Sequence, residues 1–180
     1  FDGVSDYLSI TETTGINDFA DNTPWTFACW FNQDSAKWCL PWGNDNAYVS
    51  HIGLHSERYP FFRAEGGDYY QWGTDKFEVS TWYRFVIVAS GSDSTMTAYL
   101  NGVQYGNPIN KDTVAFSYSD GAASALSAEG GSGIQLSGIG APYGSPRNHY
   151  FNGKMSNFQV WDAAWTADDV AFDYANPEQL

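Results

Sequence analysis

The stretch 151–162 limits the fold more than any other part of this 180-residue chain. Its letters read FNGKMSNFQVWD, and between 155 and 160 the residues alternate in character. We assign odd-numbered residues there to one face and even-numbered residues, including Phe158 and Val160, to the other. A period of two predicts a β-strand that lies between two different environments.

A short helix is predicted directly after this strand, over 166–174. Thr166 is a suitable N-cap, and Asp169 three residues later completes the pattern of a capping box. Val170 and Tyr174 are four residues apart, so both are expected on the helix face that packs against the strands. The chain therefore pairs a strand with a capped helix near its end.

Composition favours many short strands over long helices. Charged residues make up only 16% of the chain, while aromatic residues make up 18% and there are 18 glycines. The balance of 8 Lys and Arg against 21 Asp and Glu gives a formal net charge of −13. Such a field repels phosphate backbones, which excludes nucleic acid as an expected partner. The sequence has no apolar run of about 18 residues, so no membrane insertion is expected.

Turn signals about every 8–12 residues, with apolar runs between them, predict an all-β sandwich. The predicted strands before the last one cover 25–31, 37–42, 47–55, 59–64, 68–74, 82–89, 95–103 and 133–140. The runs 82–89 and 95–103 form the best hairpin, and Asn101-Gly102 carries the signal of a type I′ turn. The length suits one domain over 1–180.

Several large side chains are assigned to the core of this sandwich: Trp25, Trp30, Trp82, Phe85 and Trp161. The two cysteines, Cys29 and Cys39, fall on strands that we expect to be neighbours. They are either bonded to each other or two buried free thiols, and the sequence leaves both options open.

Both ends of the chain resemble one family, the laminin-G-like, concanavalin A-like lectin/glucanase (jelly-roll) domains. The closing segment is similar to the family form FNGKIDxVRIYxxALSxxEI, and the opening FDGVSDYLSI over 1–10 is similar to its first strand, FDGVDDYV. The run 25–31 is similar to FTISAWV. This resemblance implies two antiparallel sheets with one short C-terminal helix, in which the first strand pairs beside the last.

The resemblance alone does not fix the function, because this fold carries both enzymes and binding modules. Its glucanases hold catalytic carboxylates in the pattern ExDxxE, which this chain lacks. His51 and His55 lie near Tyr59 and Arg63, as in a lyase-like arrangement, but they are better explained as polar residues on a solvent-facing side. We therefore expect a non-enzyme.

Glycan binding is the expected activity. Sugar rings stack on aromatic planes, and amide, guanidinium and carboxylate groups hydrogen-bond to their hydroxyls. Two segments combine these residue types at expected strand junctions, and we predict that they meet at one edge of the sandwich. The predicted ligand-binding residues are Tyr69, Tyr70, Gln71, Trp72, Tyr143, Arg147 and His149.

Calcium is the one cofactor that the resemblance implies. It needs six to eight oxygen ligands, and the predicted metal ligands are Asp2, Asp6 and Asp162, with further oxygens available from Asp18, Asp21 and 43–46. The run 155–158 departs from the family here, because it reads MSNF where a carboxylate-bearing IDDV is common.

The sequence thus predicts a noncatalytic carbohydrate-binding module of an extracellular or surface-exposed protein, with a glycan or polysaccharide as its partner and calcium as an optional ligand. The alternative is a structural, decoration or adhesion module of a phage virion or bacterial surface, which docks to protein. A third hypothesis is an unrecognised polysaccharide-active enzyme.

Overall fold

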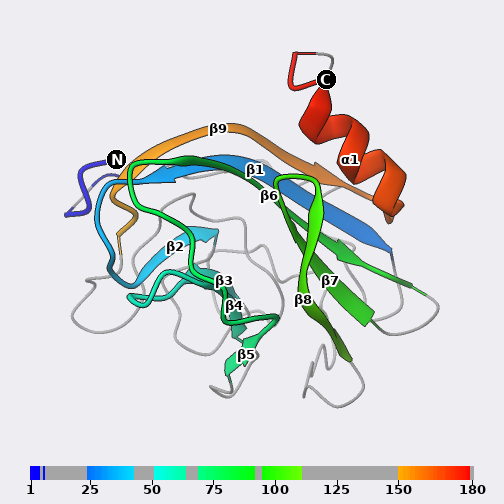
Figure 1. The fold of residues 1–180 in the computed structure, drawn as a ribbon, viewed down its shortest axis with the longest axis horizontal. Coiled ribbons are helices and arrows are strands. Elements are labelled where there is room, and N and C mark those ends of the chain that lie inside the picture. The colour runs from blue at the N-terminus through cyan, green and yellow to red at the C-terminus, as the bar shows by residue number, and fades with distance from the viewer. Residues whose placement is uncertain are drawn as a thin grey trace, which may run out of the picture.

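The computed structural model describes residues 1–4, 6, 24–42, 51–63, 69–91, 95–110 and 150–178. They form two antiparallel sheets stacked face to face, with one helix on the outer side of the larger sheet (Figure 1). The elements are β1 (Trp25–Gln33), β2 (Cys39–Trp42), β3 (His51–Leu54), β4 (Pro60–Arg63), β5 (Tyr69–Gln71), β6 (Trp82–Ala89), β7 (Thr95–Leu100), β8 (Val103–Asn110), β9 (Gly153–Trp161) and α1 (Ala167–Ala175). The predicted sandwich with a short C-terminal helix is confirmed. Within the described part, no helix has the length and apolar character needed to span a membrane.

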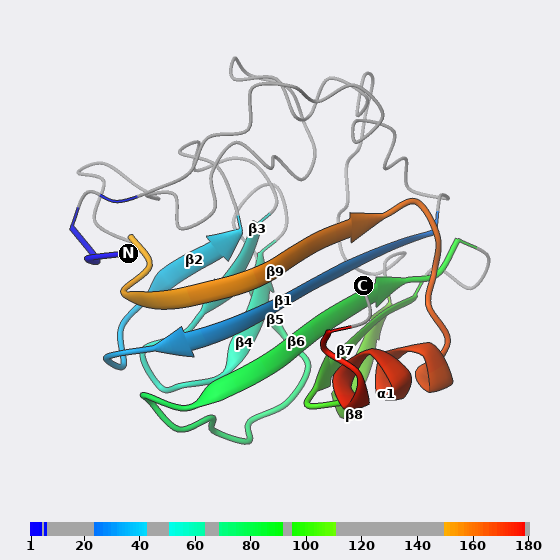
Figure 2. The same cartoon turned by 90° about the horizontal axis from the view of Figure 1, so that it is seen from above.

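The larger sheet has five strands in the order β8-β7-β6-β1-β9, which Figure 2 shows from the helix side. Its middle strands, β1 and β6, are buried over most of their length and read as nearly continuous apolar runs. The smaller sheet has four strands in the order β2-β3-β4-β5. Strands that follow one another in the chain are neighbours in it, as expected where short turns join antiparallel strands.

The core lies between the two sheets. It takes alternate residues of each strand, because successive side chains of a strand point to opposite faces. Phe27 and Phe31 of β1 and Phe85 of β6 meet Ile52 and Phe62 of the smaller sheet in one buried cluster.

Cys29 and Cys39 also lie in this core, and both are free thiols. Burial raises the pKa of each thiol to about 12. Both cysteines therefore stay protonated at neutral pH. Of the two options that the sequence left open, a disulfide or two buried free thiols, the structure shows the free thiols.

Strand β9 departs from the alternation predicted for 155–160. Its pairing with β1 shifts by one residue between Ala28 and Trp30, and Asn157 has a positive φ of 50° at this point. One extra residue in β9 therefore forms a β-bulge. Met155 consequently faces the core together with Phe158, whereas strict alternation had placed the two on opposite faces.

Strand β8 was absent from the predicted set. It follows the expected Asn101-Gly102 turn, whose φ values of 52° and 78° have the sign that a type I′ turn requires. Gly106 and Pro108 interrupt the strand pattern of its sequence. Both residues are tolerated because β8 is the edge strand of the sheet as the described residues form it.

The start of the chain pairs beside β9, as the resemblance implied. Asp2 forms an isolated antiparallel bridge with Asn152, and the terminal ammonium of Phe1 donates to the carbonyl of Gly153 at 3.0 Å. The rest of the predicted first strand, residues 7–10, lies outside the described residues.

Helix α1 begins as the sequence predicts. The Thr166 hydroxyl accepts a hydrogen bond from the amide of Asp169, whose carboxylate accepts one from the Thr166 amide at 2.8 Å. Val170 is fully buried against Ala28, Val86, Val88 and Tyr99 on the outer face of the larger sheet. Tyr174 is partly exposed and lies against the indole of Trp30, with 5.8 Å between ring centroids.

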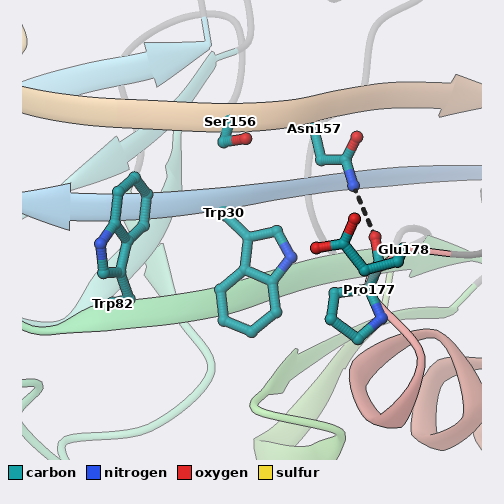
Figure 3. A pocket seen from close by; sticks show the side chains of 6 residues that line it. All are labelled: Trp30, Trp82, Ser156, Asn157, Pro177 and Glu178. Carbon is teal, nitrogen blue, oxygen red and sulfur yellow. Dashed lines mark hydrogen bonds between the residues drawn. The ribbon is translucent and has the colours of Figure 1, made fainter.

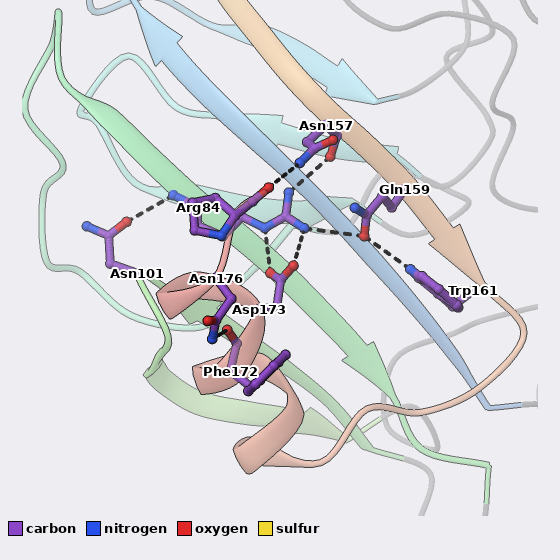
Figure 4. A network of polar contacts seen from close by, with 9 residues as sticks. Arg84, Asn101, Asn157, Gln159, Trp161, Phe172, Asp173 and Asn176 are labelled. Atoms are coloured by element: carbon purple, nitrogen blue, oxygen red, sulfur yellow. Dashed lines mark hydrogen bonds and ion pairs between the residues drawn. The ribbon is translucent and has the colours of Figure 1, made fainter. Parts of the chain in front are cut away.

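A buried ion pair joins α1 to the sheet. The guanidinium of Arg84 donates to both oxygens of Asp173, at 2.6 and 2.9 Å. It also donates to the carbonyl of Asn157 and to the side-chain oxygen of Gln159, so it connects the helix with β9 as well (Figure 4). Arg84 is 0% exposed and Asp173 is 3% exposed. Loss of either partner would strand a charge in the interior.

We therefore expect Asp173→Asn to lower the free energy of unfolding by about 3–5 kcal/mol, because Arg84 would keep its charge without a matching carboxylate. The measurement is equilibrium unfolding in urea. Glu78→Gln is the control, since Glu78 pairs with Arg58 at the surface and such pairs contribute at most about 1 kcal/mol. Equal losses in the two variants would contradict the role given to Arg84.

The helix cap generates a second prediction. Thr166→Ala should lower stability by about 1 kcal/mol in thermal or chemical unfolding, whereas Thr166→Ser, which keeps the hydroxyl, should behave like the parent. Hydrogen bonds from Thr166 lower the pKa of Asp169. A depressed carboxyl pKa adds stability above its unfolded value, and this is lost as the pH falls through the folded value. An NMR titration of Thr166→Ala should show the Asp169 pKa moving up toward the ordinary aspartate value; an unmoved pKa would contradict the capping box.

Candidate functional site

A hollow of ≈ 220 Å³ opens on the outer face of the four-stranded sheet. Four ring-bearing side chains and one amide line it: Trp38, His55, Tyr59, Phe61 and Gln71. Trp38 precedes β2, His55 and Tyr59 flank the turn between β3 and β4, and the other two residues come from β4 and β5. Two strands and the segments before β2 and between β3 and β4 therefore contribute to one small surface.

Strand register explains why these side chains point outward. Ile52 and Phe62 are paired and face the core, so the neighbouring residues Gly53, Phe61 and Gln71 form the row on the opposite face. The ring of Phe61 lies directly over Gly53, where an added Cβ would overlap it. Glycine is thus required at 53 because the aromatic ring occupies the space above its backbone.

The rings of the hollow support one another. His55 stacks on Tyr59 with 4.4 Å between centroids and 8° between planes. Trp38 meets His55 edge-on at 4.0 Å and Phe61 at 5.1 Å. Packed rings lose little conformational freedom when a ligand arrives, so the floor of the hollow is preformed.

The hollow is electrically neutral near pH 7. Burial lowers the pKa of His55, and Lys76 adds to this effect while Glu57 opposes it. The Nδ1 atom of His55 accepts a hydrogen bond from the amide of Glu57 at 3.0 Å, so the neutral ring carries its proton on Nε2. Burial also raises the pKa of the Tyr59 phenol, which stays protonated. The site therefore offers neutral polar groups and apolar ring faces.

Of the predicted ligand-binding residues, Gln71 lies in the hollow, where its side chain is exposed. Tyr69 belongs to β5 and pairs with Arg63. Tyr70 packs partly buried against the core, on the inner face of the sheet. The two neighbours Tyr70 and Gln71 thus face opposite sides of β5.

Trp72 is not at the surface, contrary to the prediction. It is 2% exposed, and its indole N–H donates to the carbonyl of Met96 at 2.9 Å. The physical reason is alternation: Trp72 follows the outward-facing Gln71 and so turns toward the core, where it meets Phe85. A buried ring has no free face on which a sugar can stack. The remaining predicted residues, Tyr143, Arg147 and His149, lie outside the described residues.

The three predicted calcium ligands do not form one site. Asp2 and Asp6 lie close together, but Asp2 accepts hydrogen bonds from the amides of Val4 and Asp6, and Asp6 accepts one from the amide of Asp2. Asp162 follows the far end of β9, about 30 Å from Asp2 at the usual rise per strand residue.

The nearby carbonyl of Gly3 already accepts from the ammonium of Lys37 at 2.6 Å. Among the described residues, no group of three His, Cys, Asp or Glu side chains could hold a metal ion. The donors present therefore do not fit calcium at the predicted position.

The sequence analysis overlooked most of the hollow. Trp38 was included in the predicted strand 37–42 and given no role, while His55 and Tyr59 were weighed for catalysis and set aside. Phe61 was included in a predicted strand and given no role. The signal that could have revealed the hollow is the pairing of Gly53 with the aromatic Phe61. This pairing becomes visible only when the register of β3 and β4 is known.

Structural comparison finds the same fold in several solved proteins. A proposed carbohydrate-binding protein of Bacteroides ovatus superposes with a TM-score of 0.67 at 19% identity, over 92% of this chain and 43% of that one. A heptameric SAP-like pentraxin of Limulus polyphemus gives 0.57 at 19%, over 84% and 70%. The Trypanosoma rangeli sialidase gives 0.57 at 12%, over 88% and 23%. The chain thus spans less than half of the bacterial protein and under a quarter of the sialidase. No curated protein matches the chain.

These structural likenesses establish the fold, and the family follows from the sequence. Residues 2–171 match a family described as the concanavalin A-like lectin/glucanases superfamily, Laminin_G_3. The match covers nearly all of the chain, including the strands that build the hollow and most of α1. The chain therefore belongs to the Laminin_G_3 family of concanavalin A-like domains.

Proposed function

We propose that this domain is a noncatalytic carbohydrate-binding module and that the hollow of Trp38, His55, Tyr59, Phe61 and Gln71 receives one sugar unit of a glycan. The observation that carries the proposal is the combination of the partly exposed rings of Trp38, His55 and Tyr59 with the exposed amide of Gln71. Phe61, which is 2% exposed, packs behind these rings and supports Trp38 without offering a free face of its own. The volume of ≈ 220 Å³ is below the range of about 300–1,000 Å³ that drug-sized ligands occupy. A single ring fits this size better than an extended ligand.

The chemistry of the hollow matches a neutral sugar. The apolar C–H face of a pyranose packs on aromatic rings, while its hydroxyls both donate and accept hydrogen bonds. Gln71 can do both through its amide, and the neutral His55 can donate from Nε2. With a net charge of −13 on the chain, a neutral glycan is preferred over an anionic one.

The described lining supports binding without catalysis. Glycoside hydrolysis ordinarily requires two carboxyl groups about 5–9.5 Å apart, and none of the five described lining residues carries one. The ring faces and Gln71 also need no metal to contact a sugar, so we propose binding that is independent of calcium. A location outside the cell or on a surface, where polysaccharides are found, fits this role.

Docking to protein, as in a decoration or adhesion module, is the competing function. The exposed aromatic residues Phe172 and Trp161, which are 57% and 40% exposed, favour it. Large exposed apolar groups often mark protein interfaces. Under this alternative, sedimentation velocity would show an oligomer, whereas the carbohydrate-binding proposal requires only a monomer.

The test of the proposed site uses affinity electrophoresis in gels that contain a neutral polysaccharide: laminarin, xylan, galactomannan or hydroxyethyl cellulose. Gln71→Ala should weaken binding about tenfold, the equivalent of one or two hydrogen bonds. Gln104→Ala is the matched control, because Gln104 is an exposed glutamine on β8 of the other sheet. Excess chelator should leave the mobility shift unchanged. Parent-like binding by Gln71→Ala would place the sugar elsewhere.

A second variant tests the architecture of the hollow. Gly53→Ala should push the ring of Phe61 out of its position, because the new methyl group would occupy the same space. We expect a loss of sugar binding together with a lowered melting temperature. Gly73→Ala is the control for lost stability, since its Cβ would also be tight, at 3.2 Å from the backbone of Gly106, but Gly73 does not line the hollow. It should keep sugar binding even if its melting temperature falls. A Gly53→Ala protein with full binding would show that Phe61 is not part of the site.

A further inference from the structure

A second and larger hollow, of ≈ 490 Å³, lies on the opposite face of the sandwich, beside α1. Its walls come from β1, β6, β9 and the segment after the helix, and its lining residues are Trp30, Trp82, Ser156, Asn157, Pro177 and Glu178 (Figure 3). The volume is within the range of about 300–1,000 Å³ that is typical of small-molecule sites.

Two tryptophans form the floor of this hollow, although both were assigned to the core from sequence. Trp82 is 42% exposed and Trp30 is half-buried. Trp30 pairs with Arg84, two residues after Trp82, so the two tryptophans are diagonal neighbours on one face of the sheet, with backbones about 7–8 Å apart. They form a platform on which more than one ring of a saccharide chain can lie.

Polar groups surround this platform. The exposed Ser156 faces the hollow because the bulge at Asn157 turns it outward beside Trp30. Asn157 uses its amide N–H to donate to the carbonyl of Pro177 at 3.2 Å. The carboxylate of Glu178 points toward the side of the hollow where Trp30 lies (Figure 3). A hydroxyl, an amide oxygen and a carboxylate beside ring faces are what a polyhydroxylated ligand requires.

Charges on this face favour a neutral ligand over a cation. Glu178 is the acidic residue among those that line the hollow. Lys154 of β9 pairs with Asn32, and Asn32 pairs with Trp82. Lys154 and Trp82 are therefore on the same face of the sheet. Arg84, under the same surface, is neutralised by Asp173. One carboxylate in the lining and one ammonium in the row beside it leave little charge within the hollow for an ion to recognise, while Asp168 and Asp169 of α1 make the surrounding face acidic.

The wall made by Pro177 and Glu178 depends on the docked helix. Arg84 binds Asp173 of α1 and the carbonyl of Asn157, and the side chain of Asn157 then holds the carbonyl of Pro177. This continuous set of polar contacts fixes the segment after the helix against the bulge of β9 (Figure 4). The hollow is therefore preorganised.

We propose that this hollow is a second saccharide site, which binds two or more units of a neutral polysaccharide chain through Trp82 and Trp30. The proposal rests on the proposed function, because both sites would bind the same class of ligand. The two sites face away from each other on opposite sheets. One monomer would therefore link two polysaccharide strands, or bind a branched one with increased avidity.

The experiment measures the two sites separately by titration with soluble oligosaccharides of the polysaccharide that retards the parent. In the parent, calorimetry should give two sites per chain. A variant with Gln71→Ala and Tyr59→Ala should keep one site and its tryptophan fluorescence change. Adding Trp82→Ala to it should weaken the remaining binding at least about tenfold, and Glu178→Gln should weaken it several-fold without disturbing the fold.

Trp161→Ala is the matched control, because Trp161 is 40% exposed on the same face of β9 and does not line the hollow. It should bind like the parent.

If the parent has one site that Gln71→Ala abolishes, the second site does not exist and the proposed function stands. If only Trp82→Ala abolishes binding, the second site stands and the first is wrong. Two results overturn the proposal. One is no sugar binding by the parent. The other is that the hollow at Trp82 binds hexalysine, a cationic peptide that would pair with Glu178, but binds no sugar.

Discussion

The buried pair of Arg84 and Asp173 is the interaction on which the arrangement of the outer face depends. A fully buried guanidinium requires acceptors in several directions, and these come from the helix, from the β9 backbone and from Gln159. Burial of such a pair contributes little net stability compared with an apolar substitute of the same shape. Its geometry is nevertheless demanding, so it defines where α1 lies on the sheet. The sandwich core would form without it, but the helix would then be held by apolar and ring contacts such as those of Val170 and Tyr174.

The two faces of the domain are built differently. On the smaller sheet, the hollow is made by packing, because a ring crosses a glycine and neighbouring rings hold each other in place. On the larger sheet, the hollow is made by polar contacts that hold the segment after the helix above two indoles. The first surface therefore has fixed apolar walls, whereas one wall of the second depends on docking of a helix nine residues long.

Much of the fold could be predicted from the sequence because its signals are local. The Asn101-Gly102 turn and the Thr166 cap each act within a few residues, and both appear in the structure. The alternation predicted for 155–160 is interrupted by the bulge at Asn157. The sites depend on which face each residue takes, and that requires register. Trp72 and Trp82 look alike in the sequence, yet one is buried and the other exposed. Asp173 carries no local sign of its partner, which lies 89 residues earlier in the chain.

The bulge in β9 has an evolutionary consequence. Before Asn157 the strand pairs with β1 in one phase, and after it in another, so Met155 and Phe158 share the core while Ser156 faces outward. Loss of the single residue Asn157 would let both halves pair with β1 in one continuous ladder and keep every core side chain facing inward. The same deletion would remove the carbonyl bound by Arg84 and the amide that holds Pro177. A deletion or insertion of one codon can therefore remove or restore the hollow beside α1 in descendants of this domain. The core residues of β9 keep their inward positions in either case.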